Sequence, residues 1–169
     1  MKTKLLLSII LCVFTLNVGA KDLSIKDLQD SLYVWTKDQV EIERVSLGLS
    51  GATFSKNYTK ISTDDIDWYV EIRTDASRKK VNRMSMSMKT RDYGEIKEVM
   101  ELCADGLINK SFNVLRKNIS SYDTSANVIF RSKENQMICI VNLSTLSYES
   151  TMFTFSISFF GLEESKSFR

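Results

Sequence analysis

The stretch DWYVEIR, residues 67–73, alternates between apolar and polar or amphipathic side chains, so that Trp68, Val70 and Ile72 share one face. The stretch NRMSMSM, residues 82–88, repeats this alternation after a short polar segment. Successive side chains of a β-strand point to opposite faces, so each stretch predicts a strand with one buried face. Two such runs joined by a polar turn predict an antiparallel β-hairpin.

Three more strands are predicted in the second half of the chain, over residues 126–131, 136–143 and 150–160. The middle one is apolar on both faces, which is typical of a central strand covered on both sides. The chain that follows Gly161 is polar, and we expect it to be frayed.

The segment between the first helix and the hairpin is harder to assign. Alternation over residues 39–49 predicts a strand with a bulge near Arg44, and a helix extended through Val45 is the alternative. Residues 50–65 have the composition of a loop or an irregular edge strand.

Two helices are predicted. The first covers residues 24–37, with Ser24 as its N-cap and an acid in the first turn. The second is a long helix over residues 93–117, in which Gly106 is unfavourable by about 1 kcal/mol of propensity. The apolar stripe of this helix contains Ile96, Val99, Met100, Cys103, Leu107, Val114 and Leu115.

These elements define a fold class. Short connections between strands imply antiparallel neighbours, and segregated helices and strands are typical of α+β proteins. We therefore expect one α+β domain over residues 21–169, with an antiparallel sheet of about five to six strands. The N-terminal helix and one long central helix are expected to pack on one face of this sheet.

Residues 1–20 have the pattern of a cleaved signal peptide. Lys2 and Lys4 precede an apolar run over residues 5–16, and small residues end at Ala20. The run is too short to cross a hydrocarbon core of about 30 Å, so we expect no stable membrane insertion after cleavage. An uncleaved membrane anchor is the alternative. The predicted location is the periplasm or the extracellular space.

Composition excludes several classes of function. The chain of 169 residues has no histidine, which excludes Ser-His and Cys-His catalysis and imidazole metal sites. Removal of the signal peptide would take two lysines and no acid from the 23 basic and 21 acidic side chains, leaving them balanced. This balance gives no electrostatic case for binding nucleic acid. No cofactor motif is present, so no cofactor is expected.

Cys103 and Cys139 are the cysteines that remain after cleavage. Cys103 lies on the apolar face of the predicted long helix, and Cys139 lies in the middle of a predicted strand. If that helix covers that strand, the two thiols face each other, and an exported chain would join them in a disulfide. Two separate buried thiols are the alternative.

Met84, Met86 and Met88 project from one face of a predicted strand. Thioethers are soft ligands that suit Cu(I), so a Cu(I)-handling site is one interpretation. Methionine also fills the core face of strands, and any half-buried strand shows this spacing. The core interpretation is therefore favoured.

Other short motifs carry no functional prediction. Asp64, Asp65 and Asp67 lack the glycine and terminal glutamate of an EF-hand, so they are interpreted as solvated loop acids. Residues 77–80 match S-x-x-K by chance, because no accompanying catalytic motif is present. The N-x-S/T acceptor pattern occurs at Asn57, Asn109, Asn118 and Asn142.

The tyrosines give the one positive indication of a partner. Exposed tyrosine is favoured at protein interfaces because it offers a large contact area at low entropic cost. The candidate interaction residues are Tyr58, Tyr69, Tyr93, Tyr122 and Tyr148. Ordinary surface tyrosines are the alternative.

The sequence therefore predicts a small exported binding protein without catalysis. Its expected partner is another exported protein, and it would act as an inhibitor or an immunity-type protein. A carrier of an apolar ligand is the second hypothesis. The carrier would hold its ligand between the sheet and the long helix, in a cavity lined by Phe153, Phe155, Phe159 and the methionine strand.

Overall fold

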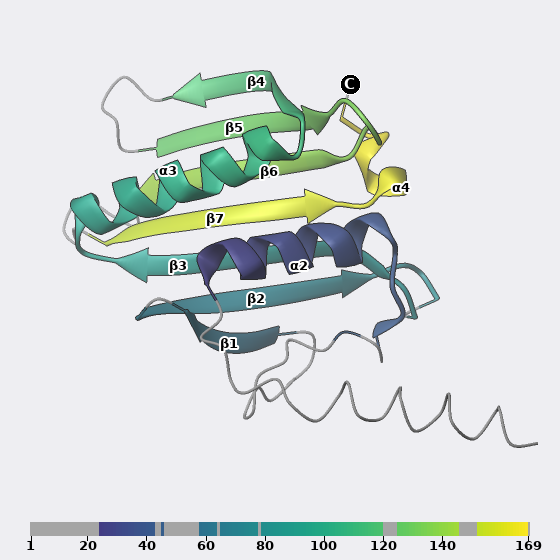
Figure 1. Ribbon diagram of the computed structural model, residues 1–169, viewed down its shortest axis with the longest axis horizontal. Helices are drawn as coiled ribbons and strands as arrows, with labels where there is room; N and C mark the ends of the chain where they lie inside the picture. Colours follow the sequence, from purple (N-terminus) through teal and green to yellow (C-terminus); the bar gives the residue numbers. More distant parts are fainter. Residues whose placement is uncertain are drawn as a thin grey trace, which may run out of the picture.

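The computed structural model of this chain has an α+β fold (Figure 1). It describes residues 24–42, 45, 58–63, 65–77, 79–119, 125–145 and 152–168. The helices in this part of the chain are α2 (Ile25–Lys37), α3 (Tyr93–Asn109) and α4 (Leu162–Ser165). The strands are β1 (Tyr58–Thr63), β2 (Ile66–Thr74), β3 (Val81–Thr90), β4 (Phe112–Ile119), β5 (Ser125–Ser132), β6 (Ile138–Thr145) and β7 (Phe153–Phe160).

The seven strands form one antiparallel sheet in the order β1-β2-β3-β7-β6-β5-β4. The last strand of the chain thus lies at the centre, between β3 of the first half and β6 of the second. Ile157 of β7 is opposite Met86 on one side and Val141 on the other. The predicted hairpin is confirmed as β2 and β3, in which Val70 is opposite Met86.

The sheet has seven strands, so the prediction of about five to six was wrong. β1 lies within the segment interpreted as a loop or irregular edge strand. β4 begins within the segment predicted to be the end of the long helix, because α3 stops at Asn109. Ser111 then takes a left-handed backbone conformation with φ of 58°, and the buried Phe112 starts a strand opposite Ser132.

The predicted strand over residues 39–49 is only partly within the described chain. Glu41 forms an isolated antiparallel bridge with Lys80, and Val40 accepts a hydrogen bond of 2.9 Å from the backbone N–H of Val81. Val45 is buried. Residues 43, 44 and 46–49 of this segment lie outside the described residues.

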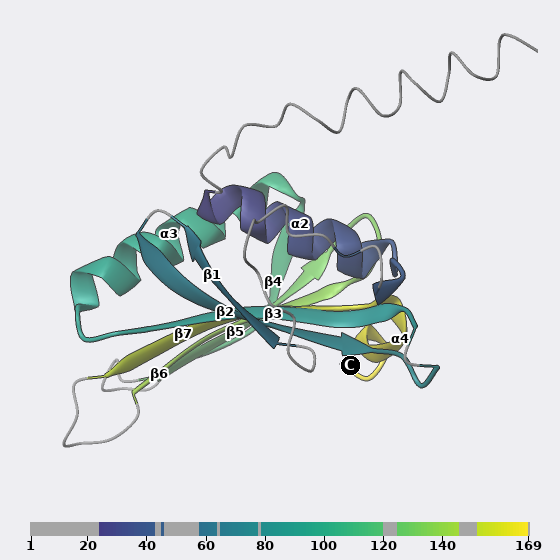
Figure 2. The same cartoon turned by 90° about the horizontal axis from the view of Figure 1, so that it is seen from below.

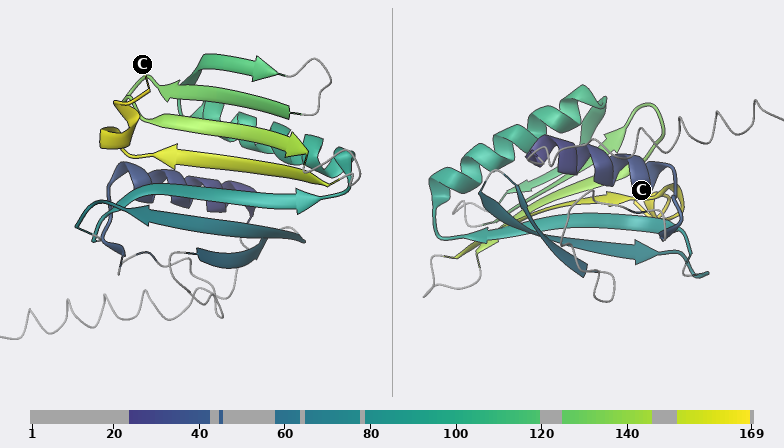
Figure 3. Two further views of the ribbon diagram at one scale, coloured as in Figure 1. Left: turned by 180° about the vertical axis from the view of Figure 1, so that it is seen from behind. Right: turned by 60° about the horizontal axis from the view of Figure 1, so that its bottom comes forward.

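α2 begins where the sequence predicted. The Ser24 hydroxyl accepts a hydrogen bond from the backbone N–H of Asp27, whose carboxylate accepts one from the backbone N–H of Ser24. This capping box satisfies donors that the first helical turn leaves unpaired. Figure 2 shows α2 and α3 on the same side of the sheet, and in the view from behind the strands lie in front of both helices (Figure 3).

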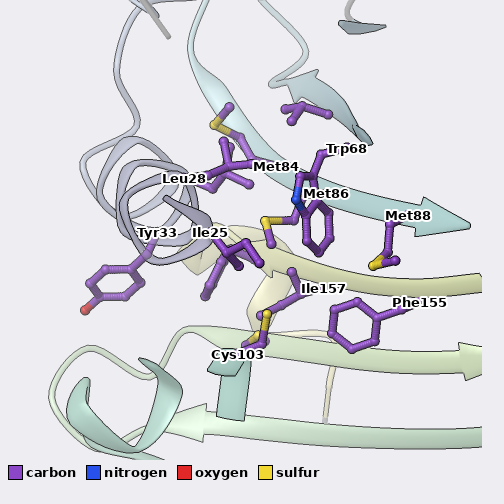
Figure 4. Close-up of a cluster of buried hydrophobic side chains, with 14 of the residues drawn as sticks. Ile25, Leu28, Tyr33, Trp68, Met84, Met86, Met88, Cys103, Phe155 and Ile157 are labelled. Carbon is purple, nitrogen blue, oxygen red and sulfur yellow. The ribbon is translucent and has the colours of Figure 1, made fainter. Parts of the chain in front are cut away.

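The hydrophobic core lies between these helices and the sheet (Figure 4). Met84, Met86 and Met88 are almost fully buried in it. The rings of Trp68 and Phe155 meet edge to face, with their centroids 6.3 Å apart. Met, Trp and Phe bury large apolar areas here, which is the dominant favourable contribution to folding.

The described chain after Gly161, residues 162–168, contains α4 and packs against the sheet, so the expectation of a frayed tail was wrong. The buried Ser165 hydroxyl of α4 accepts a hydrogen bond from the Ile138 backbone N–H and donates one to the Phe160 carbonyl, both of 3.0 Å. The ring of Phe168 packs on that of Phe160 at 5.0 Å. These contacts join the last turn of chain to β6 and β7.

Candidate functional site

α3 carries two apolar stripes that lie side by side on the helix. The first contains Ile96, Val99, Cys103 and Leu107, which are buried against the sheet. The second contains residues at the same helical spacing, Met100, Ala104 and Ile108, displaced by about one position along the chain. Met100 and Ala104 are half-buried, and Ile108 is 66% exposed. The second stripe is therefore only partly covered by the described part of the fold, and Ile108 is its most exposed member.

An apolar groove of about 400 Å³ lies beside this second stripe. α3 contributes Tyr93, Ile96, Met100 and Ala104 to its wall, and the sheet contributes Ile119, Ala126 and Leu143. The polar members are Lys97, Glu101 and Ser125. A concave, mostly apolar surface with a few polar groups is the usual form of a binding site.

Chain connectivity explains why the groove is open. α3 starts just after β3 ends and stops just before β4 begins. These two strands are separated by β7, β6 and β5, so the helix must cross the sheet obliquely (Figure 1). β4 then runs away from the helix, and its last residue, Ile119, remains 45% exposed.

The candidate tyrosines do not gather on one described surface. Tyr93 borders the groove, is 54% exposed, and packs its ring 5.6 Å from that of Phe153. Tyr69 lies on β2 between the buried Trp68 and Val70, so its side chain is on the other face of the sheet. Tyr122, Tyr148 and the side chain of Tyr58 lie outside the described residues.

The two cysteines are free buried thiols, so the predicted disulfide is absent from the structure and that prediction is corrected. Burial raises the pKa of Cys103 to about 12. The pKa of Cys139 is also raised, mainly by burial and then by the neighbouring Cys103. Helix-over-sheet packing therefore places the thiols in one layer, as the pattern indicated, but a disulfide also needs a specific geometry that periodicity cannot provide.

The methionines of β3 lie in the core rather than at a surface. The Cu(I) interpretation required their thioethers to be exposed together, and the burial of all three favours the core interpretation. Within the described residues, no group of three or more His, Cys, Asp or Glu side chains is arranged to hold a metal ion.

Two polar motifs are used within the fold. The Asp67 carboxylate contacts Lys60 at 2.5 Å and accepts a hydrogen bond of 2.6 Å from the Ser62 hydroxyl. The hydrogen bond from Lys60 is the main cause that lowers the pKa of Asp67. Ser77 donates a hydrogen bond to Asp75 in the turn between β2 and β3. Asp64 lies outside the described residues.

The residues that line the groove in the structure differ from those predicted to line the cavity of an apolar carrier. Phe155, Phe159 and the methionines of β3 are fully packed, and none of them lines the groove. The groove lies instead between α3 and the β4–β6 half of the sheet. Sequence reasoning missed it because β4 was assigned to the helix. The uncovered apolar positions of α3 were the available signal.

A larger hollow of about 780 Å³ lies beside α4. Charged groups around it interact within the chain: Lys166 pairs with Glu163 at 2.7 Å, and Arg131 donates a hydrogen bond of 2.5 Å to the Phe168 carbonyl. The Arg131 Nε is buried without a hydrogen-bond partner in the described part of the chain. Lys166 and Glu163 are paired with each other, and the more apolar groove beside α3 is the stronger candidate for a binding site.

None of the described helices combines the length and apolar character needed to cross a membrane. Comparisons of the chain with protein-family models, with curated proteins and with solved structures each found no match.

Proposed function

We propose that this chain is an exported binding protein without catalysis of its own, which holds apolar side chains of another exported protein in the groove beside α3. It would act as an inhibitor or an immunity-type protein. The observation that carries this proposal is the partly exposed apolar stripe of α3, which faces an edge strand that has exposed apolar side chains.

Among the described residues, six of the eight large apolar side chains that are exposed lie on α3 and β4. Tyr93 and Ile108 of α3 are 54% and 66% exposed, and Val114, Leu115 and Ile119 of β4 are 58%, 44% and 45% exposed. Contiguous exposed apolar surface on a small protein usually marks an interaction site. The centres of protein interfaces are also enriched in aromatic and apolar groups.

Two features predicted from the sequence complete the proposal. Residues 1–20 act as a cleaved signal peptide, which delivers the chain to the periplasm or the extracellular space. The α+β domain keeps α2 and α3 on one face of the sheet, because burial of the first α3 stripe fixes the helix and leaves the second stripe available to a partner.

A carrier of an apolar small ligand is the second candidate function. The groove of about 400 Å³ falls in the range of roughly 300–1,000 Å³ that small-molecule sites occupy, which supports this alternative. Native mass spectrometry separates the two functions, since a carrier purified from its own host retains mass beyond that of the polypeptide.

The proposed function is tested by filling the groove. Ala104→Trp places an indole in the groove, whereas Leu102→Trp places the same group about 200° around α3. Wild type and both variants are used to capture exported proteins from the host's own secretome or cell envelope. We expect one exported protein to bind wild type and Leu102→Trp but not Ala104→Trp. Equal capture by all three would contradict the proposal.

A further inference from the structure

We propose that β4 is a strand-addition site, at which an extended segment of the partner, containing acidic as well as apolar residues, pairs with the free edge of the sheet. This inference rests on the proposed function and specifies how the partner is bound. Added strands are recognised by main-chain hydrogen bonds, with side chains providing specificity.

β4 has the form of an available edge. It is the last strand of the sheet, with β5 on one side and no described strand on the other. Seven of its eight residues are exposed, all except Phe112. The outward N–H and C=O groups of an edge strand are unpaired and form a template for another strand.

The opposite edge, β1, differs in three respects. It has six residues, against eight in β4, and its Ile61 and Thr63 are buried. Its Lys60 forms an ion pair with Asp67 of the adjacent strand. Within the described part of the chain, Arg116 and Lys117 of β4 have no such ion pair.

The charge of β4 indicates what binds to it. Phe112–Ile119 contains Arg116 and Lys117 and no acidic residue. If two copies of this chain paired antiparallel through the middle of β4, either Arg116 or Lys117 would lie opposite the same cation of the other copy, which is destabilising. Glu or Asp side chains on an added strand would instead complement them. The edge therefore disfavours self-association and favours an acidic segment.

The apolar residues of β4 determine where the side chains of the added strand go. Val114 and Ile119 are opposite Phe130 and Ala126, on the helix side of the sheet, and both are exposed. Apolar side chains on that face of an added strand would cover them. Ile119 also lines the groove, so the edge and the groove form one continuous surface.

A first experiment uses short peptides as probes. The acidic probe has eight residues of Val and Thr with two adjacent Glu at its centre, and the control probe has two Lys there. We expect the acidic probe to bind at least tenfold more tightly by fluorescence anisotropy. Arg116→Glu/Lys117→Glu should reverse this preference, and Lys79→Glu/Lys80→Glu, an adjacent exposed pair in the β2–β3 turn, should leave it unchanged.

A second set of probes tests main-chain pairing. A strand pairs through the N–H groups of alternate residues along one edge. N-methylation of the acidic probe at odd or at even positions should therefore abolish binding in one set and preserve it in the other. The inference would be overturned if the odd and even N-methylated probes bound equally well, or if neither unmodified probe bound. It would also be overturned if Arg116→Glu/Lys117→Glu still preferred the acidic probe.

Partner capture separates this inference from the proposed function. If Ala104→Trp prevents capture and Arg116→Glu/Lys117→Glu does not weaken it, the strand-addition site is wrong while the groove function stands. If Ala104→Trp captures as wild type does, the proposed function is wrong. If Ala104→Trp and Arg116→Glu/Lys117→Glu both lose capture of the partner while Lys79→Glu/Lys80→Glu still captures it, the groove function and the strand-addition site are both supported.

Discussion

Gln29 of α2 lies directly against Gly106 of α3, and its side-chain amide donates a hydrogen bond of 3.0 Å to the Cys103 carbonyl. A Cβ atom on Gly106 would lie 2.5 Å from the Gln29 side-chain oxygen. The glycine that is unfavourable for helix propensity thus leaves room for the buried Gln29 side chain between the two helices.

Gly106→Ala should lower the free energy of unfolding by about 1–2 kcal/mol. Overpacking a buried contact costs about 1–3 kcal/mol, which exceeds the gain of up to about 1 kcal/mol in helix propensity. Urea unfolding measures the change. In a double-mutant cycle with Gln29→Ala, the double variant should lose less free energy of unfolding than the two single variants lose in total. A stabilising Gly106→Ala would show that the helices tolerate the extra methyl group.

The thiols of Cys103 and Cys139 should resist alkylation in the folded protein. Both side chains are buried, and the pKa of Cys103 is about 12, so the reactive thiolate is scarce at pH 8. Mass spectrometry after treatment with iodoacetamide should show no modified cysteine in native protein from which residues 1–20 have been removed, and two after unfolding in guanidinium. A mass without either label in the unfolded, non-reduced sample would show that the cysteines are linked.

Stability should decrease at alkaline pH. The unfolded thiol loses its proton near its usual pKa of 9.0, whereas the folded Cys103 keeps its proton until about pH 12. The stabilisation is therefore complete below pH 9 and is lost as pH rises toward 12. The slope is about 1.4 kcal/mol per pH unit for each thiol. Unfolding between pH 8 and pH 10.5 should show a shallower slope in Cys103→Ala than in wild type, and identical slopes would contradict the assignment.

Met86→Ala should destabilise the protein by about 2–5 kcal/mol, because Met86 is fully buried and its truncation leaves a cavity. Met86→Leu conserves volume and should cost less than about 1.5 kcal/mol. Ser85→Ala, on the other face of the same strand, serves as the control and should be close to neutral. Thermal unfolding measures all three. A neutral Met86→Ala would argue against a core role.

Ser165→Ala should cost about 1–3 kcal/mol, since it leaves the buried Ile138 N–H without the acceptor it has in the structure. Ser167→Ala removes an exposed hydroxyl that bonds only the Glu164 carbonyl, and it should change stability by less than about 0.5 kcal/mol. Chemical unfolding of both variants tests the difference. Equal effects would mean that α4 does not secure the ends of β6 and β7.

The sequence predicted the elements whose burial pattern is local and regular. α2 carries both a capping box and an apolar stripe, and β2 and β3 alternate without interruption. The predicted end of the long helix was wrong, because Val114 and Leu115 continue the helical spacing of α3. The left-handed Ser111 and the pairing of Phe112 with Ser132 end the helix instead.

The amino-acid sequence by itself determined the α+β class, the β2–β3 hairpin and the buried face of each of those strands, because alternation and helical spacing act over a few neighbouring residues. Tertiary structure alone decided that β7 lies at the centre, that β4 is an edge, and that one stripe of α3 stays open. These features depend on pairing between residues distant in the chain, which no local pattern encodes.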